Sequence, residues 1–197
     1  MVNVAKIREG FINTKQPKLD EIIEIDETYI GGKEDNKHMK DRIKSTKIER
    51  KSIVLGMKQR DGKIIAKQVP DTKAITLINE IIKSVKTDSK VFTDELRSYF
   101  NLYCNFNHKT VNHSKGKYVK YDFSKDKIHT NGIESFWSML KRGCVGTYHQ
   151  FSRKHLHRYI AEFSGRFNIR NLDTLQQMES VAFNFVGKRL QYNSFVA

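Results

Sequence analysis

One hairpin signal constrains the fold of this chain more than any other feature. Asp61-Gly62 lies between two apolar runs at 52–57 and 64–69, and a two-residue Asp-Gly connection favours the tight turn that joins antiparallel strands. A third run at 22–30 is β-branched, alternates in polarity and ends at two glycines. We therefore expect three antiparallel strands at the start of the fold.

The rest of the chain alternates between helical and strand patterns. Asp71 is expected to be the N-cap of a helix. The apolar stripe of that helix is Ile75, Ile78, Ile82 and Val85. Strands are expected at 90–94 and 109–113, with a helix over 96–106 between them. Two late helices follow residue 130, with apolar faces at Ile133, Phe136, Trp137 and Leu140 and at Leu156, Tyr159, Ile160, Phe163 and Phe167.

This order, β-β-β-α-β-α-β-α-α, predicts the α/β class. It implies a mixed five-stranded sheet with helices on both faces, which is the order that the ribonuclease-H-like fold uses. At 197 residues the chain is long enough for one domain. We place that domain at 21–171, preceded by a lead-in at 1–20 and followed by a carboxy-terminal extension at 172–197.

The charge is strongly positive and unevenly distributed. The net charge is +14, with a net of +7 over 36–63 and +6 over 141–170, whereas 1–35 has a net of −3. A solvated surface explains any one charged run, but two basic stretches together with an acidic one suit a protein that binds phosphates and keeps carboxylates for chemistry. The charge therefore points to a polyanion such as nucleic acid.

Several other classes of protein fit poorly. The chain has no long apolar run, which argues against a membrane partner. Its two cysteines, Cys104 and Cys144, are far apart, so we expect neither a zinc ribbon nor a disulfide framework. Six of seven histidines lie between His108 and His157 without a convincing zinc spacing, and we interpret them as phosphate contacts or packing.

Two aspartates occupy positions that a sheet-based site would use. Asp26 lies inside an apolar run, where a carboxylate is costly unless it is paired. The alternative is an outward-facing side chain, since alternation places Glu24, Asp26 and Thr28 on one face. Asp94 ends the strand at 90–94, at the edge where open α/β sheets bind ligands. Its alternative role is a cap for the next helix.

A third carboxylate, Glu134, lies on the first late helix. It shares one helix face with Asn131, Ser138 and Lys141, opposite the apolar set. If that set packs on the sheet, the polar face lies along the rim. An ordinary amphipathic helix with a Glu–Lys surface pair accounts for the same spacing.

The three acids together suggest a metal site. If the first and fourth strands are neighbours, Asp26 and Asp94 approach each other, and the late helix can bring Glu134 to the same edge. Carboxylates without Cys or clustered His ligands favour Mg²⁺ or Mn²⁺. Two such ions can activate a water or a 3′-hydroxyl and stabilise the leaving oxygen of a phosphodiester. The chain is therefore a candidate for phosphoryl transfer on nucleic acid.

Several segments, in order, resemble the catalytic domain of bacterial insertion-sequence DDE transposases. The chain is most similar to the insertion sequence 1595 family, with its ISXO2-like transposase domain, and the likeness runs from about Ile22 to Asn171. It is carried by 25–34 (IDETYIGGKE), Thr93-Asp94-Glu95 and 129–143 (HTNGIESFWSMLKRG), with shorter matches at 111–114, 117–119, 146–149, 154–156 and 166–171.

This resemblance implies two bound Mg²⁺ or Mn²⁺ ions and metal-dependent cleavage and strand transfer at transposon ends. By position, Asp26, Asp94 and Glu134 match the family's catalytic, metal-binding acids. The DNA-binding residues it implies are Lys141, Arg142, Asn131 and His129. It further implies that the partners are transposon-end and target DNA and a second subunit. We expect a cytoplasmic protein at the nucleoid, with neither a membrane partner nor a small-molecule substrate.

Members of this family usually begin with a zinc ribbon and a helix-turn-helix that read the terminal inverted repeats. The chain starts too late for either domain, so we expect a catalytic core without its own end recognition. Two other functions remain open: a catalytically silent DNA-binding remnant, and a ribonuclease-H-like nuclease acting on RNA–DNA hybrids. The fold alone does not choose among these substrates.

Overall fold

A mixed sheet organises the structure. The computed structural model describes residues 7–12, 16–31, 51–111, 120–121 and 127–188. In this part of the chain five strands form one sheet in the order β3-β2-β1-β4-β5. Their bounds are Ile22–Ile30 for β1, Ser52–Gln59 for β2, Ile64–Val69 for β3, Lys90–Thr93 for β4 and Asn107–Thr110 for β5.

The pairing directions match the sequence analysis. β1 pairs antiparallel with β2, and β2 pairs antiparallel with β3 across the Asp61-Gly62 turn. β4 joins β1 in parallel, and β5 joins β4 in parallel. The first and fourth strands are therefore neighbours, which was the condition for an approach of Asp26 and Asp94.

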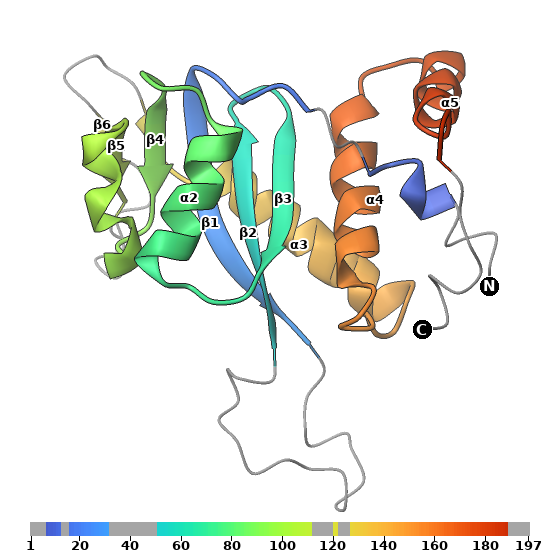
Figure 1. Cartoon of the computed structure of the whole chain (residues 1–197), viewed down its shortest axis with the longest axis horizontal. Coiled ribbons are helices and arrows are strands. Elements are labelled where there is room, and N and C mark those ends of the chain that lie inside the picture. Colours follow the sequence, from blue (N-terminus) through green and yellow to red (C-terminus); the bar gives the residue numbers. More distant parts are fainter. Residues whose placement is uncertain (1–6, 13–15, 32–50, 112–119, 122–126, 189–197) are drawn as a thin grey trace, which may run out of the picture.

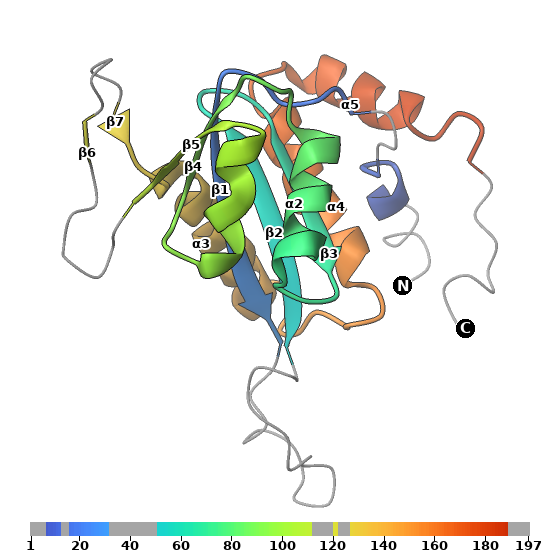
Figure 2. The ribbon, with the colours of Figure 1, turned by 60° about the vertical axis from the view of Figure 1, so that its left-hand side comes forward.

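Helices cover both faces of this sheet, as expected of a ribonuclease-H-like α/β fold (Figures 1 and 2). The helix α2 and the 3₁₀ helix η3 lie on one face, and α3 lies on the other. The described helices are α2 (Ala74–Ser84), η3 (Arg97–Cys104), α3 (Asn131–Gly146), α4 (Leu156–Ile169) and α5 (Thr174–Phe183). A short pair, β6 (Lys120–Tyr121) and β7 (Lys127–Ile128), stands apart from the main sheet.

The alternation along β1 and β2 builds two cores, because successive side chains of a strand point to opposite faces. Ile25, Leu55 and Met57 pack with the buried residues of α2 and η3. Val54 and Ile30 pack instead with α3 and α4. The second core buries the whole predicted apolar face of α3.

The buried face of α2 matches the predicted stripe only in part: Val85 is buried and Ile78 packs against the core as expected. Ile75 is 78% exposed and Ile82 is exposed as well, whereas Leu77 and Ile81 are fully buried. The apolar residues form one broad face of this helix, wide enough for two overlapping stripes, and the docking on the sheet buries the side with Leu77 and Ile81 most deeply. The predicted cap is also wrong: the helix begins after Lys73, and an Asp71 carboxylate oxygen accepts a hydrogen bond from the Lys73 amide.

Other predicted elements differ in type or in their bounds, or lie outside the described residues. The segment expected to be helical at 96–106 is a 3₁₀ helix over Arg97–Cys104. The fifth strand ends at Thr110 rather than running to residue 113, and 112–113 lie outside the described residues, as does the predicted loop at 32–50. The pair β6–β7 and the helix α5 were not predicted. None of the residues of α5 is buried.

The lead-in contacts the late helices. The Arg8 guanidinium donates a hydrogen bond to Glu162 of α4 and lies over the rings of Tyr148 and Tyr159. Arg158 of α4 pairs with Glu9 in return. The proposed boundaries at 20–21 and 171–172 stay predictions.

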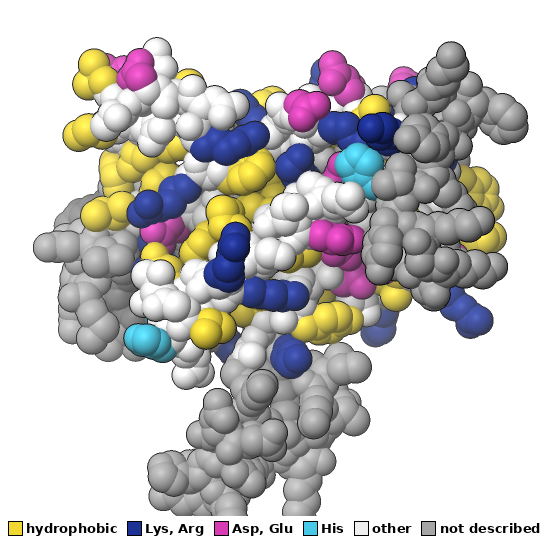
Figure 3. Space-filling view, turned by 180° about the vertical axis from the view of Figure 1, so that it is seen from behind, with side chains coloured by type: hydrophobic (Ala, Val, Ile, Leu, Met, Phe, Trp, Pro, Cys, Tyr) yellow, Lys and Arg dark blue, Asp and Glu magenta, His cyan; other side chains and the backbone are white. Residues whose placement is uncertain are grey.

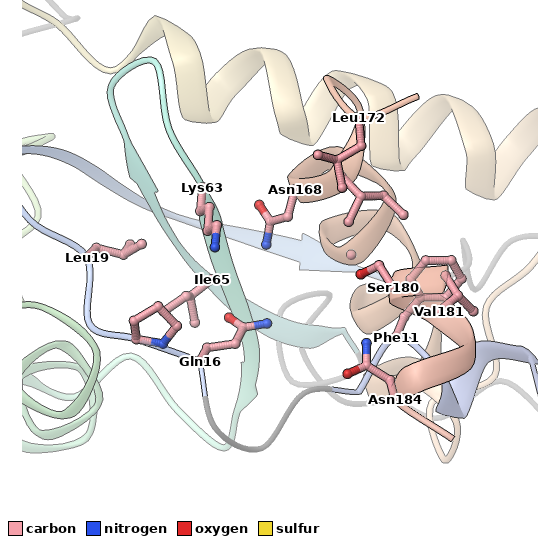
Figure 4. Close-up of a pocket in the computed structure, with 13 residues that line it drawn as sticks. Phe11, Gln16, Leu19, Lys63, Ile65, Asn168, Leu172, Ser180, Val181 and Asn184 are labelled. Atoms are coloured by element: carbon pink, nitrogen blue, oxygen red, sulfur yellow. The ribbon is translucent and has the colours of Figure 1, made fainter. Parts of the chain in front are cut away.

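Asn168 of α4 closes the edge strand β3. Its side-chain oxygen accepts a hydrogen bond of 2.7 Å from the Ile64 amide, and its side-chain nitrogen donates one of 2.9 Å to the Ile64 carbonyl. Figure 4 shows Asn168 directed toward β3, beside a cavity of about 280 Å³ between β3, α4 and α5. The amide supplies the bonds that a neighbouring strand would make, which protects an otherwise open edge.

We expect Asn168→Ala to destabilise the protein, because it leaves both backbone groups of Ile64 without these partners. The loss should be about 1–3 kcal/mol in the free energy of unfolding, measured by urea denaturation. Asn171→Ala, at an exposed position just beyond α4, is the matched control. Equal unfolding midpoints for the two variants would contradict this role.

Candidate active site

Three carboxylates meet where β4 ends beside the middle of β1. Asp26, Glu27 and Asp94 each offer one oxygen, and these oxygens lie within 4.8 Å of one another. We call these three residues the acidic group. The last β1–β4 pair is Glu24 with Phe92, so β1 runs on beyond the end of β4. Side chains from both faces of β1 can turn into the space beside it, which explains how two consecutive residues reach one place.

Trp137 of α3 holds Asp26 in position. Its indole nitrogen donates a hydrogen bond of 3.0 Å to the Asp26 carboxylate. The ring lies against Gly56, which pairs with Asp26 across β1 and β2, and a Cβ at position 56 would come within 2.5 Å of that ring. Glycine at this position therefore makes room for the indole beside the carboxylate.

Burial and neighbouring charge raise the pKa of Asp26 to about 7. Desolvation is the largest cause, and the negative charges of Glu27 and Asp94 add to it, while the indole hydrogen bond acts in the opposite direction. Near neutral pH this carboxyl is therefore divided between its protonated and ionised forms. A divalent cation would remove the repulsion and favour the ionised form.

Neutral or backbone donors hold the other two acids. The Tyr99 hydroxyl of η3 donates a hydrogen bond of 2.6 Å to Glu27, whose pKa is raised, mainly by burial. The Leu96 amide donates a hydrogen bond of 3.1 Å to an Asp94 carboxylate oxygen, as in the turn that opens η3. The carboxylates thus converge through donors that carry no positive charge.

This donor set fits a hard divalent cation. Three carboxylate oxygens drawn together against their own repulsion, with sulfur and imidazole outside the group, match the preference of Mg²⁺ and Mn²⁺. Asp26 and Asp94 are brought together as the sequence analysis expected. Glu27 joins them in place of the expected Glu134.

Glu24 anchors α3 to the sheet. Its carboxylate is almost fully buried and accepts hydrogen bonds from the amides of Gly132 and Ile133 in the first turn of α3. Arg60 donates to the other carboxylate oxygen, and the His129 ring nitrogen lies 3.3 Å from it. A buried anion at a helix amino terminus satisfies free amides and the helix dipole together. The same contact fixes the helix that carries Trp137.

The remaining predicted residues lie on or beside α3. Glu134 is exposed in the first turn, outside the acidic group, and its carboxylate accepts a hydrogen bond from the Thr130 hydroxyl. Asn131, Lys141 and Arg142 are exposed on the same helix. Figure 3 views the molecule from the side that α3 covers and shows Lys and Arg side chains spread across that face. His129 is half-buried beside Glu24, and burial is the main cause of its lowered pKa.

Sequence reasoning missed Glu27, Tyr99 and the role of Glu24. Strand alternation assigns Glu27 to the face opposite Asp26, and only the early end of β4 brings the two side chains together. Tyr99 is one of several aromatic residues in its segment, and its hydroxyl finds Glu27 only after η3 docks. Glu24 shares a face with Asp26, which was visible, but its contact with α3 depends on the packing.

We expect Gly132→Ala to destabilise the protein, although alanine forms helix better than glycine. A Cβ at position 132 would lie 2.6 Å from a Glu24 oxygen and 2.8 Å from the Lys58 ammonium nitrogen, so the buried anchor would have to shift. Gly146→Ala, at the other end of α3 with nothing within 4 Å of the added Cβ, should change stability by about −0.5 to +1 kcal/mol.

Thermal unfolding of the two glycine variants tests this. A midpoint for Gly132→Ala at or above that of the unmodified chain would contradict the assigned role of Glu24.

Without metal, Asp26 should make the stability of the protein depend on pH. Its pKa is about 7 in the folded state and about 3.8 in the unfolded chain, so the folded state binds the extra proton between these values. The contribution is complete below about pH 4 and is lost as the pH rises through 7. Asp26→Asn cannot ionise, so its advantage over the unmodified chain should grow to about 4 kcal/mol by pH 8.

Urea denaturation in EDTA from pH 5 to 8 measures this difference, with Asp88→Asn at an exposed position as the matched control. Parallel stability curves for Asp26→Asn and the unmodified chain would refute the raised pKa.

The described helices include none that is long and apolar enough to cross a membrane.

Comparison with known proteins places the chain in a family. A curated protein of Haemophilus influenzae, described as an uncharacterized transposase-like protein, is 34% identical over 107 residues, which cover 54% of this chain and 81% of that protein. Residues 18–168 match the family described as the ISXO2-like transposase domain, and this match includes the whole sheet, the acidic group and α3. The chain therefore belongs to the ISXO2-like transposase family.

Proposed function

We propose that this chain is the catalytic core of a DNA transposase, which cleaves DNA at transposon ends and joins the released ends to target DNA. The observation that carries the proposal is the acidic group, in which oxygens of Asp26, Glu27 and Asp94 lie within 4.8 Å in a chain of a transposase family. A site of this kind suits phosphoryl transfer better than chemistry that needs a nucleophilic side chain.

Asp26 and Asp94 would hold Mg²⁺ or Mn²⁺, with Glu27 as a further ligand and two ions as the expected number. Such ions, when bound, lower the pKa of a water or hydroxyl and offset charge on the phosphate. The chain itself supplies position: the Trp137 indole orients Asp26, and the Tyr99 hydroxyl orients Glu27. Both donors are neutral, so they leave the negative charge of the site available to a cation.

Glu134 remains the proposed third catalytic acid of the family pattern. It lies on the first turn of α3, the turn that Glu24 fixes to the sheet, and Trp137 follows it by three residues on the same helix. Its side chain is exposed, and a turn toward the acidic group on binding of metal and DNA would complete the set. The hydrogen bond from Thr130 is one contact that this turn would break.

DNA is the proposed partner, at both transposon ends and target. Lys141 and Arg142 are exposed on α3, where they would contact phosphates next to the site, with Asn131 and His129 as further proposed contacts. The charge of +14 supports a salt-dependent contact with a polyanion. Joining two ends requires at least two subunits, so we propose a dimer or a larger assembly on DNA, at the nucleoid in the cytoplasm.

One observation favours a second candidate, a catalytically silent DNA-binding protein with the same fold. Glu134 lies outside the acidic group, so the set of three acids that the family pattern requires is not assembled in the described residues. This candidate shares the basic surface and the affinity for DNA. It differs in lacking metal-dependent cleavage and joining.

Strand transfer tests the proposal. A labelled, pre-cut duplex end and a supercoiled plasmid would be incubated with the chain and Mg²⁺ or Mn²⁺. We expect joined product, and a loss of about a hundredfold or more in Asp26→Asn, Asp94→Asn and Glu134→Gln, because each removes a charge that the metal site needs. Asp88→Asn, the same change at an exposed position outside the site, should retain the full activity.

A second measurement separates failure of assembly from absence of a metal site. Mn²⁺ should raise the thermal midpoint of the unmodified chain and of Asp88→Asn, but not that of Asp26→Asn. DNA binding with neither joining nor metal stabilisation would support the silent protein. Joining that persists in Asp26→Asn would refute the assignment of the acidic group.

A further inference from the structure

The 3₁₀ helix η3 carries an exposed row of one cation and two aromatic rings. Arg97, Phe100 and Tyr103 are spaced three residues apart, and a 3₁₀ helix has three residues per turn, so the three side chains align on one face. Phe100 is 70% exposed and Tyr103 is 61% exposed, and their rings meet edge to face at 5.7 Å. The opposite face, with Tyr99 and Leu102, is fully buried. We call Arg97, Phe100 and Tyr103 the aromatic row.

The aromatic row lines a cavity of about 620 Å³ against the edge strand β5. Its other walls include Lys109 and His108 of β5 and Ile128 of β7, with Glu95 at the end next to the acidic group. A volume of this size is in the range of small-ligand sites. The cavity therefore combines two flat apolar surfaces with the cations Arg97 and Lys109, opposed by one carboxylate.

Short chains of contacts connect this cavity to the acidic group. Tyr99, the residue before Phe100, donates its hydroxyl to Glu27. The Leu96 amide, one residue before Arg97, donates to Asp94. On the other wall, the ring of His108 hydrogen-bonds the Thr93 hydroxyl, next to Asp94. Residues that line the cavity are thus adjacent in sequence to residues that contact or belong to the acidic group, on both η3 and β4–β5.

We propose that the aromatic row binds unpaired DNA bases next to the phosphate that reacts. This rests on the proposed function, because it assigns a second contact to the DNA of the same site. Bases stack on exposed aromatic rings whatever their sequence, and a cation beside the rings suits the phosphate between two bases. Bases inside a duplex have both faces covered, so the row selects frayed ends and single-stranded extensions.

Charge and geometry favour this occupant over a second copy of the chain. The chain is strongly basic, so two copies repel each other, whereas DNA is attracted. The row also shares η3 with Tyr99, which contacts the acidic group, and this suits a ligand long enough to reach both places.

Fluorescence anisotropy in EDTA tests the proposal without chemistry. The probes are a blunt duplex and the same duplex with a short single-stranded adenine extension, at one ionic strength. The unmodified chain should bind the extended duplex more tightly. Replacing both rings (Phe100→Ala with Tyr103→Ala) should weaken binding of the extended duplex by roughly five- to hundredfold and leave the blunt duplex unchanged.

Two variants control for folding and for surface aromaticity. Tyr103→Phe keeps the ring and should bind the extended duplex as the unmodified chain does. Phe183→Ala removes a ring that is 78% exposed on α5 and should change neither affinity. The fluorescence of 2-aminopurine in the extension should report stacking in the unmodified chain and lose that signal in the double variant.

Unchanged affinity of the double variant for the extended duplex would overturn the proposal, as would equal losses on both duplexes. A double variant that changes the sedimentation of the DNA-free protein instead would identify the row as an interface between copies, and would overturn it too. Because the assay needs no metal, a chain without strand transfer can still show the preference for the extension. The failure of either proposal is thus visible separately.

Discussion

The buried Glu24 carboxylate is the contact on which the arrangement of the site depends. It joins the centre of the sheet to the first turn of α3 through the amides of Gly132 and Ile133, and Arg60 compensates its charge from the side. A charge at this depth is stable only when it is paired and hydrogen-bonded, so it tolerates few alternative positions of the helix. The indole of Trp137 reaches Asp26 because this contact sets the position of α3 on the sheet.

Next to this contact, the fold brings negative charges together, which lowers the free energy of unfolding. Asp26, Glu27 and Asp94 converge where β1 extends beyond the end of β4. Burial and charge repulsion raise the pKa of Asp26 to about 7. Neutral donors on α3 and η3 orient the carboxylates without neutralising them. An arrangement that costs free energy in the free protein is typical of a site built for a ligand, and a divalent cation is the ligand that these oxygens suit.

The two helices that orient the acids also present the surfaces proposed for DNA. α3 carries Trp137 toward the sheet and Lys141 and Arg142 toward solvent, and η3 carries Tyr99 toward Glu27 and its aromatic row toward solvent. Each helix therefore links a carboxylate of the site to an exposed surface within one or two turns. DNA bound as proposed on those surfaces would therefore contact the same helices that orient the acids.

The sequence by itself determined the order of elements, the mixed sheet, the apolar face of α3, the approach of Asp26 to Asp94 and the family. These follow from local signals: an Asp-Gly hairpin, alternation with a period of two, a helical stripe with one clear solution, and motifs that lie in a fixed order. Only the tertiary structure decided which stripe of α2 is buried, that Glu27 joins the acidic group while Glu134 lies outside it, and that Glu24 anchors α3. Each of these depends on how one element packs against or ends beside a neighbour distant in sequence, as β4 ends beside β1, and no local pattern encodes that arrangement.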